Sequence, residues 1–457
     1  QYSWLKTSSV KKKGRDKRTE KETEKRTNER TNERTNKQTN KEAKKQTKET
    51  KVNNEAKEKS TEIKMSVIGI DVGSANCVIA HASRKGVVTV LNEATQRRSS
   101  NLISFRDGQR HLASDADSVA RGNYKNSVWF CNRLLGHLSE GEKFDEEIKY
   151  HPYRGVFGKD AQGRLVATMQ YGSEKCQYRP VQLVAMLLGK LQRVVMREVK
   201  GVPDVVITVP SWFDDRQRRL CLAACEIANV RCLQLLNDNV AVALQYGIWK
   251  NKKGLFDDGK KHHALFLDMG ASQFTCTAAK YEKGVLQILA SASDKNLGGR
   301  LIDLEICKYL AAEFKAKTGN DVMTNPKSLI KLMQAAQKAK HNVCGGVPSA
   351  AINVECLMND ADLNAKLSRE KLAEIMEPLL PRLVVPLKRV LSETGMEGKD
   401  FDLGIECVGG SMRAPAFVRE AAKVLGTDLE ARNCGLSRTL DMDEAAAHGA
   451  CPQCAMK

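Results

Sequence analysis

The chain has 457 residues, 41% of them apolar, so it can bury the cores of two or three lobes and is neither a peptide nor a wholly disordered chain. Its formal net charge of +19 is uneven, because residues 1–64 alone hold 21 Lys and Arg against 11 Asp and Glu. Fourteen cysteines are too few for a disulfide scaffold, and no apolar run reaches the roughly 18 residues of a spanning helix, so we expect a cytoplasmic protein without a membrane partner.

Residues 1–64 differ in composition from all that follows. They are mainly Lys, Arg, Glu, Thr and Asn, with the near-repeat RTNERTNERTNKQTNK, and hold too few apolar side chains to offset the entropy of an unfolded chain. A basic tail can contact nucleic acid by releasing counterions, but the interleaved acids favour a solvated appendage. We expect a disordered, basic, low-complexity extension and no nucleic-acid partner.

From Met65 onwards, short β-type runs alternate with helix-length amphipathic runs, which is the pattern of an α/β protein. Buried strands are predicted at residues 67–70, 205–209, 265–267 and 405–408. A helix is predicted from Pro180, and a second one, capped by Asp214 or Asp215, runs towards Ala228. The polar, glycine-containing segment 254–262 predicts a bridge between two halves.

A weak internal duplication is the most informative feature. Residues 67–76 and 263–272 each read as an apolar strand, an Asp, one apolar residue, a Gly and small residues. Such turns let backbone N–H groups approach phosphate oxygens, and Asp71 and Asp268 can hold Mg²⁺ through water. Either turn alone is common in hairpins, but the pair predicts a phosphate clamp. The candidate binding residues are Gly73, Ser74, Ala75, Asn76, Gly270, Ala271 and Ser272.

A third turn follows the strand at 405–408 and opens a helix. Its glycines permit close approach to a ribose or phosphate, and Arg413 can stack on a purine. The alternative is an ordinary strand-to-helix turn with a surface arginine. The candidate residues here are Gly409, Gly410, Ser411 and Arg413.

Together these turns resemble the actin-like ATPases, and within them the nucleotide-binding domain of heat-shock protein 70 type chaperones. Further matching segments are residues 206–218, 236–248, 297–300 and 443–450. The resemblance covers Met65 to about Ala455. It implies an α/β, actin-like ATPase fold with lobe I at 65–253 and lobe II at 263–457, each with a duplicated sheet-and-helix core, and a nucleotide cleft between them.

Two details resemble the large, 110 kDa heat-shock protein branch. The second turn reads Asp-Met-Gly-Ala-Ser in place of a glycine-rich turn, and Arg300 stands where standard chaperones have Glu. This branch implies a stress-response chaperone that binds ATP or ADP with Mg²⁺ and acts as nucleotide exchange factor for a heat-shock protein 70 partner. The family's peptide-binding domain is not found in these residues, so we expect unfolded clients as partners only if that domain follows.

Other departures concern hydrolysis. An ungapped count back from Arg133 puts Asp117 where the family's phosphate-binding lysine would lie, and an anion there would repel phosphate. The resemblance also puts Thr275 in place of a carboxylate and Asp238 in place of a Glu. These losses predict weak or no hydrolysis, since phosphoryl transfer depends on charge neutralisation. The alternative is an active, ATP-hydrolysing chaperone.

The segment 331–340 resembles the helix that faces adenosine in the family. The resemblance places Gln337, Lys340 and Cys344 where side chains meet the base and ribose. A solvated helix face is the alternative for Lys338 and Lys340.

Overall fold

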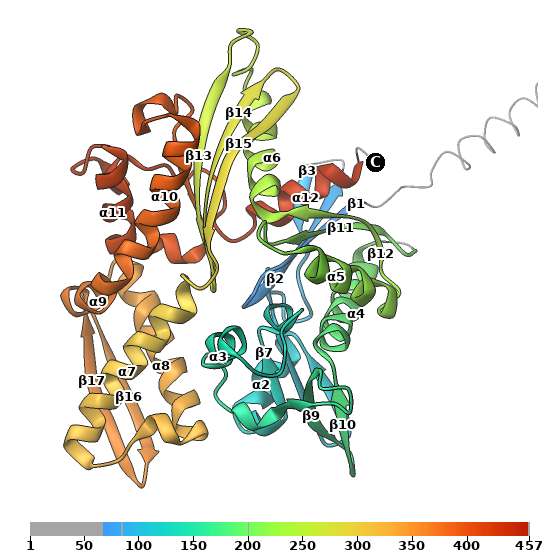
Figure 1. Ribbon diagram of the computed structural model, residues 1–457, viewed down its shortest axis with the longest axis vertical. Coiled ribbons are helices and arrows are strands. Elements are labelled where there is room, and N and C mark those ends of the chain that lie inside the picture. The colour runs from blue at the N-terminus through green and yellow to red at the C-terminus, as the bar shows by residue number, and fades with distance from the viewer. Residues whose placement is uncertain (1–66, 84–85, 200, 456–457) are drawn as a thin grey trace, which may run out of the picture. The chain divides into compact units, whose positions relative to one another are not determined.

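The computed structural model describes residues 67–83, 86–199 and 201–455, and the predicted extension lies outside them. Residues 66–457 form a unit of their own. Within the described residues, five sheets and the helices around them make a mixed α/β structure (Figure 1). No helix in these described ranges combines the length and apolar character needed to cross a membrane.

The main sheet of the first half has the strand order β12-β11-β1-β2-β3, with β4 paired to β2. Its strands are β1 (Val67–Val72), β2 (Asn76–Ser83), β3 (Gly86–Thr89), β4 (Ser99–Ser100), β11 (Asp204–Val209) and β12 (Arg231–Asn237). β1 is parallel to β11 and antiparallel to β2. The predicted strands 67–70 and 205–209 are therefore confirmed as neighbours in one sheet.

Helices α4 (Pro180–Glu198) and α5 (Asp215–Ile227) pack together and share a core with this sheet. α4 starts at the predicted Pro180, and the apolar side chains spaced along one face of it are buried. The remainder of this half consists of β5 (Leu102–Arg106), β6 (Gln109–Leu112), α2 (Ser114–Ala120), β7 (Ser127–Trp129), α3 (Glu142–Ile148), β8 (Phe157–Lys159), β9 (Leu165–Tyr171) and β10 (Glu174–Tyr178).

The main sheet of the second half repeats this arrangement, with the order β15-β14-β13-β18. β13 is antiparallel to β14 and parallel to β18, as β1 is to β2 and β11. Its strands are β13 (His262–Met269), β14 (Phe274–Glu282), β15 (Val285–Asp294) and β18 (Ile405–Val408). The duplicated sheet predicted from the two turns is thus present.

Helices and a two-stranded ribbon complete the second half. They are α7 (Gly299–Thr318), α8 (Pro326–Cys344), β16 (Ser349–Met358), β17 (Ala361–Ser368), α9 (Arg369–Met376), α10 (Leu380–Thr394) and α11 (Pro415–Leu425). α10 packs against β14 and β15, while α7 and α8 contact each other lower in the view of Figure 1.

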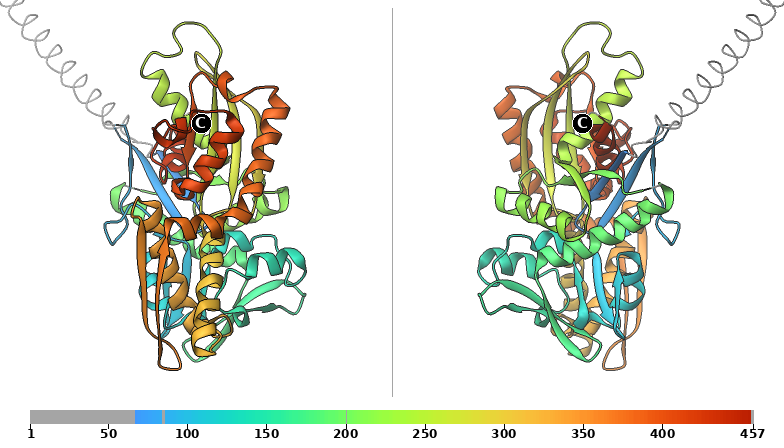
Figure 2. Two further views of the ribbon diagram at one scale, coloured as in Figure 1. Left: turned by 90° about the vertical axis from the view of Figure 1, so that its left-hand side faces the viewer. Right: turned by 90° about the vertical axis from the view of Figure 1, so that its right-hand side faces the viewer.

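Two helices cross between the halves. α6 (Asp238–Asn251) shares a core with β13 and β14, whereas α12 (Ala445–Ala455) packs on β1 and β11 (Figures 1 and 2). The two helices also contact each other, and a Cβ on Gly449 would lie 1.7 Å from the carbonyl oxygen of Ala241. Only glycine permits this approach. The sheet of each half is therefore covered by a helix that comes from the other half. The boundaries of the predicted bridge, residues 254–262, stay a prediction.

Candidate functional site

The three predicted turns lie on one cleft of about 770 Å³, lined by both halves. Every residue predicted to bind a cofactor or a metal lines this cleft, namely Asp71, Gly73, Ser74, Ala75, Asn76, Asp268, Gly270, Ala271, Ser272, Gln337, Lys340, Cys344, Gly409, Gly410, Ser411 and Arg413. The structure thus brings together segments more than 300 residues apart in sequence. The role of each residue stays a prediction.

The first and second turns face each other across the cleft. The Oγ atoms of Ser74 and Ser272 are 2.5 Å apart. β1 and β13, which precede the turns, each have a parallel neighbour, so both turns lie at the carboxyl ends of parallel strands. That end of a parallel sheet is where ligands bind in α/β proteins.

The third turn is fastened to the second. Gly409 has a φ of 80°, and a Cβ there would lie 2.3 Å from the carbonyl oxygen of Met269, so a glycine is required. The hydroxyl of Ser411 donates a hydrogen bond of 2.8 Å to the carbonyl of Gly270. The amide of Gly299, the first residue of α7, donates to the same carbonyl at 3.0 Å. Both turns and the start of α7 therefore form one surface of backbone groups.

The half-buried carboxylates that line the cleft include Asp71, Asp238 and Asp268, which interact with one another. Desolvation raises the pKa of Asp71 to about 6, of Asp238 to about 7 and of Asp268 to about 8. The charge of Asp71 contributes to the rise at both others, and the hydroxyl of Thr208, which donates to Asp71, partly offsets the rise there. The described residues contain no group of three His, Cys, Asp or Glu side chains that could hold a metal ion directly, so a cation here would be held through water.

Helix α8 supplies the side chains predicted to face adenosine. Lys340 is only 6% exposed, because its ammonium group pairs with Asp303 at 2.8 Å and donates to the carbonyl of Gly299 at 3.0 Å. The solvated-face alternative for Lys340 is therefore wrong. Gln337 is exposed and Cys344 is half-buried.

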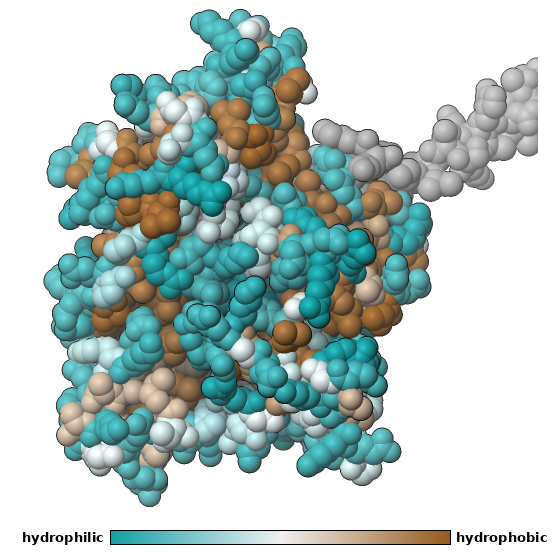
Figure 3. Space-filling view, viewed as in Figure 1, coloured by the Kyte–Doolittle hydropathy of each residue, from teal (hydrophilic) through white to brown (hydrophobic). Residues whose placement is uncertain are grey.

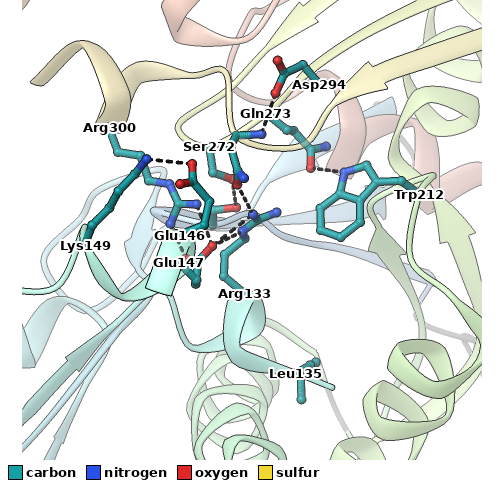
Figure 4. A network of polar contacts seen from close by, with 12 residues as sticks. Arg133, Leu135, Glu146, Glu147, Lys149, Trp212, Ser272, Gln273, Asp294 and Arg300 are labelled. Atoms are coloured by element: carbon teal, nitrogen blue, oxygen red, sulfur yellow. Dashed lines mark hydrogen bonds and ion pairs between the residues drawn. The ribbon is translucent and has the colours of Figure 1, made fainter. Parts of the chain in front are cut away.

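An ion network that the sequence analysis missed crosses the cleft. Glu147, in α3, is 1% exposed and accepts hydrogen bonds from Arg133 Nη2 at 3.0 Å and from Arg300 Nη2 at 2.8 Å (Figure 4). Although burial acts to raise it, the two guanidinium groups hold the pKa of Glu147 well below its usual range. Arg133 belongs to the first half and Arg300 to α7, so Glu147 joins the halves. The sequence analysis singled out Arg300 as unusual, but no motif in the sequence indicated that Glu147 is its ion-pair partner.

A second set of contacts runs beside this network. The Trp212 ring N–H donates to the side-chain oxygen of Gln273 at 2.8 Å, and the Gln273 amide donates to Asp238 at 2.7 Å. The guanidinium of Arg133 lies 4.8 Å from the centre of the Trp212 ring. Figure 4 shows Trp212 and Gln273 pointing towards each other on the side away from Glu147.

The model of the family described as "Hsp70 protein" matches residues 67–457. The chain belongs to the Hsp70 family. This match confirms the predicted actin-like ATPase fold and implies nucleotide binding.

Curated relatives place the similarity within the Hsp70 family. Heat shock protein hsp88 of Neurospora crassa is 34% identical over 394 residues, which are 86% of this chain and 54% of the relative. The 97 kDa heat shock protein of Strongylocentrotus purpuratus is 35% identical over 393 residues, 86% of this chain and 43% of the relative. Heat shock protein 88 of Dictyostelium discoideum is 33% identical over 391 residues, which are 85% of this chain and 49% of the relative. These matches confirm the resemblance to the large branch, and the chain spans about half the length of these relatives.

One departure from the Hsp70 pattern, Asp117, lies at the cleft. Its carboxylate accepts a hydrogen bond of 2.6 Å from Ser100. The amides of Asn132 and Asn101 donate to backbone carbonyls of the first turn, to that of Val72 at 2.8 Å and to that of Gly73 at 2.9 Å. Because Asp117 lines the cleft, its place at the position of the family's lysine stays a prediction.

The Lys and Arg side chains among the described lining residues are all paired with carboxylates. Arg98 and Arg413 lie 3.5 Å and 3.4 Å from Asp443. Lys340 pairs with Asp303, and Arg300 with Glu147. Thr275, which replaces a carboxylate of the family pattern, is buried and lies 3.0 Å from Ser293 Oγ.

Proposed function

We propose that this chain binds ATP or ADP with Mg²⁺ in the cleft and acts in the cytoplasm as a nucleotide exchange factor for an Hsp70 partner, with weak or no hydrolysis of its own. The observation that carries the nucleotide part is the meeting of three backbone-lined turns at one cleft of the Hsp70-type domain.

Phosphate binding is supported by the groups that surround the turns. The helix α7 begins at Gly299 and its first amide lies against the second turn. The amides of Gly299 and Arg300 already donate to the carbonyls of Gly270 and Ala271, so the N-terminus of α7 would favour a polyanion through its helix dipole. The candidate phosphate contacts are those of the first two turns, from Gly73 to Asn76 and from Gly270 to Ser272.

Mg²⁺ binding is supported by the three crowded carboxylates. Asp71 and Asp268 would hold the ion through its water molecules, as hard oxygen donors do. Burial, and after it the repulsion between the carboxylates, raises the pKa of Asp238 and Asp268, and the ion would offset both effects by neutralising the charges. When bound, it would supply charge neutralisation to the phosphates.

Weak hydrolysis is supported by the charges in the cleft. Asp117, which the resemblance places where the family has a lysine, cannot neutralise phosphate as a cation would, and the amide of Gln273 donates a hydrogen bond to Asp238. The cations of the described lining are paired with carboxylates. Positive charge aimed at the reacting phosphate is a main source of rate in phosphoryl transfer, so nucleotide would act mainly as a ligand that sets lobe geometry.

The exchange role rests on the similarity to the large heat-shock proteins. Because the chain spans about half of these relatives, their complete activity is part of the proposal, and client binding is proposed only together with a peptide-binding domain. The test measures release of fluorescent ADP from a purified Hsp70, with and without this chain. Accelerated release is expected, and an unchanged rate would overturn the exchange role.

Two further measurements separate the outcomes for nucleotide. Calorimetric titration should show saturable, Mg²⁺-dependent binding of ATP and ADP. If no heat of binding is observed, the domain does not bind nucleotide and this part of the proposal is wrong. A single-turnover assay with radiolabelled ATP should give a rate far below that of an ordinary Hsp70. Comparable turnover that disappears in Asp268→Ala would establish the active ATPase instead.

A further inference from the structure

Three cysteines cluster outside the cleft, where α5 packs on β12. Cys221 and Cys225 lie one helical turn apart on α5, and Cys232 is the second residue of β12. Cys221 and Cys225 are buried in the core of the first half, and Cys232 is half-buried at its margin. Neither the cleft nor the ion network uses these thiols.

The backbone between Cys225 and Cys232 reverses tightly. Asn229, just past the end of α5, has a left-handed φ of 54°. The amide of Val230 donates to the carbonyl of Cys225 at 2.9 Å, which is the closing hydrogen bond of a Schellman turn. The amide of Cys232 then donates to the carbonyl of Val230 at 2.9 Å. This reversal returns the chain alongside α5, where Cys232 packs against the core that contains Cys225 and the two thiols interact electrostatically. The Cys232 thiol donates to the carbonyl of Gln234 at 3.4 Å.

The two thiols differ in reactivity. The pKa of Cys232 is lowered, because the Cys225 thiol and backbone groups stabilise its thiolate, whereas the same interaction and burial raise the pKa of Cys225. Cys225 is 3% exposed, and Cys232 is more open to solvent. A half-exposed thiol that forms its thiolate more readily, with a second thiol in contact, is the arrangement of an attacking and a resolving cysteine.

We propose that Cys225 and Cys232 form a reversible disulfide when the protein meets hydrogen peroxide. The Cys232 thiolate attacks one peroxide oxygen, the O–O bond breaks, and Cys232 becomes a sulfenic acid while the other oxygen leaves as water after taking up a proton. The Cys225 sulfur then attacks the Cys232 sulfur, and the hydroxide that leaves takes the Cys225 proton to form a second water. Two thiols are oxidised, one peroxide is reduced, and a dithiol reverses the reaction.

The surface around the pair is open to a small neutral oxidant. Leu222, Ile227 and Leu233 are 41%, 59% and 40% exposed. Figure 3 shows hydrophobic surface reaching solvent in the region of α4, α5 and β12. Uncharged peroxide can approach such a surface without losing favourable charge interactions.

The cross-link would act on an element that leads to the cleft. β12 runs from Arg231 to Asn237, and the next residue is Asp238 of the carboxylate cluster. A small cavity is lined by Cys221 and Cys225 on one side and by Thr208 of the cleft on the other. The disulfide itself does not depend on nucleotide binding, so its test stands apart from that of the proposed function.

Trypsin makes the test direct, because cleavage after Arg219, Arg231 and Lys250 separates Cys221 and Cys225 from Cys232. The full chain is treated with hydrogen peroxide, remaining thiols are blocked by alkylation, and the digest is analysed by mass spectrometry without reduction. The expected product is peptide 220–231 joined to peptide 232–250, lost after treatment with dithiothreitol. Unlinked peptides, or only irreversible sulfinic and sulfonic acids on Cys232, would overturn the proposal.

Two matched variants identify the resolving thiol. Cys221→Ala should leave the joined peptides in place, whereas Cys225→Ala should remove them and leave Cys232 as sulfenic acid, which dimedone traps. Persistence of the link in Cys225→Ala would assign it to Cys221 and contradict the proposed pair. The map of the unaltered chain decides whether a link forms even if a variant does not fold.

Discussion

At the scale of the single residue, the burial of His151 makes the stability of the protein depend on pH. It is 4% exposed and lies between Phe130 and Phe157, with ring centres 5.8 Å and 4.9 Å away. Both ring nitrogens lack a hydrogen-bond partner among the described residues. Burial therefore lowers the pKa of His151 from 6.5 to about 4. The unfolded state takes up the proton first, so stability falls as the pH drops from 6.5 towards 4.

His151→Phe should remove this dependence. The wild-type protein should lose about 2 kcal/mol of unfolding free energy between pH 7 and pH 5 through His151, since one pKa unit corresponds to 1.36 kcal/mol. The variant keeps an aromatic ring in an aromatic site and should lose correspondingly less. Urea unfolding at both pH values measures the difference, and parallel losses in the two proteins would show that His151 is charged in the folded state.

Asp268 should show opposite effects on stability and on binding. Without Mg²⁺ its charge is desolvated and repelled by Asp238 and Asp71. Asp268→Asn should therefore raise the unfolding temperature in EDTA, while the loss of an anionic oxygen should weaken Mg²⁺–ATP binding at least about tenfold. Thermal unfolding tests the expected rise in stability, and calorimetry tests the expected loss of Mg²⁺–ATP affinity.

The control for this change is Asp257→Asn. Asp257 is exposed and pairs with Lys283 at 3.0 Å, away from the cleft. Exposed ion pairs contribute little, so neither property should change. An Asp268→Asn protein that binds Mg²⁺–ATP as tightly as the wild type would remove this residue from the proposed metal site.

At the scale of the element, α5 depends on its cap. The Asp214 carboxylate accepts a hydrogen bond of 2.8 Å from the amide of Gln217, whereas Asp215 is an exposed residue that pairs with Arg219. Asp214→Ala should cost about 1 kcal/mol of unfolding free energy, because an orphan amide loses its acceptor. Asp215→Ala should cost no more than a few tenths of a kcal/mol. Equal losses in urea unfolding would contradict the assignment of the cap.

Elements that carry a local signal could be predicted from the sequence. The strand at 405–408 and the helix from Pro180 were predicted with their observed starts, because a buried strand and a proline-initiated helix are local patterns. β13 is longer than predicted, since its pairing with β14 continues beyond the apolar residues 265–267. The exchange of α6 and α12 between the halves depends on distant contacts, such as Gly449 against Ala241, and has no local signal.

The residues of the candidate site were likewise predictable from the sequence only where they carry a local signal. Glycine-containing turns after strands are visible in sequence, and the structure places all of them on one cleft. Partners such as Glu147 are single acidic residues in a short helix and look like surface charge until the fold buries them. The ungapped count leads to Asp117, which lines the cleft, but spacing along the chain does not fix what a side chain contacts, so its role stays a prediction.

At the scale of the whole molecule, the Glu147 network joins the two halves. Mutations can distinguish its contribution to stability from its contribution to holding the halves together. Arg133 and Glu147 lie in the first half, and of the two arginines only Arg300 comes from the second. Glu147→Gln would leave two buried guanidinium groups without their anion and should destabilise the protein by about 3–5 kcal/mol. Arg300→Met keeps the Arg133–Glu147 pair and removes the ion pair across the cleft. Chemical denaturation should therefore show the larger loss for Glu147→Gln.

Arg300→Met should also speed the release of bound nucleotide, since the closed arrangement of the lobes loses one of its connections. We expect ADP dissociation to be about tenfold faster, equivalent to roughly 1.4 kcal/mol. Arg382→Met is the matched control, because Arg382 pairs with Asp294 at 2.7 Å within the second half. Stopped-flow displacement of fluorescent ADP measures both rates. If the two variants release ADP equally fast, the network stabilises the fold without holding the cleft closed; if only Arg300→Met is fast, the ion pair across the cleft sets how long nucleotide stays bound.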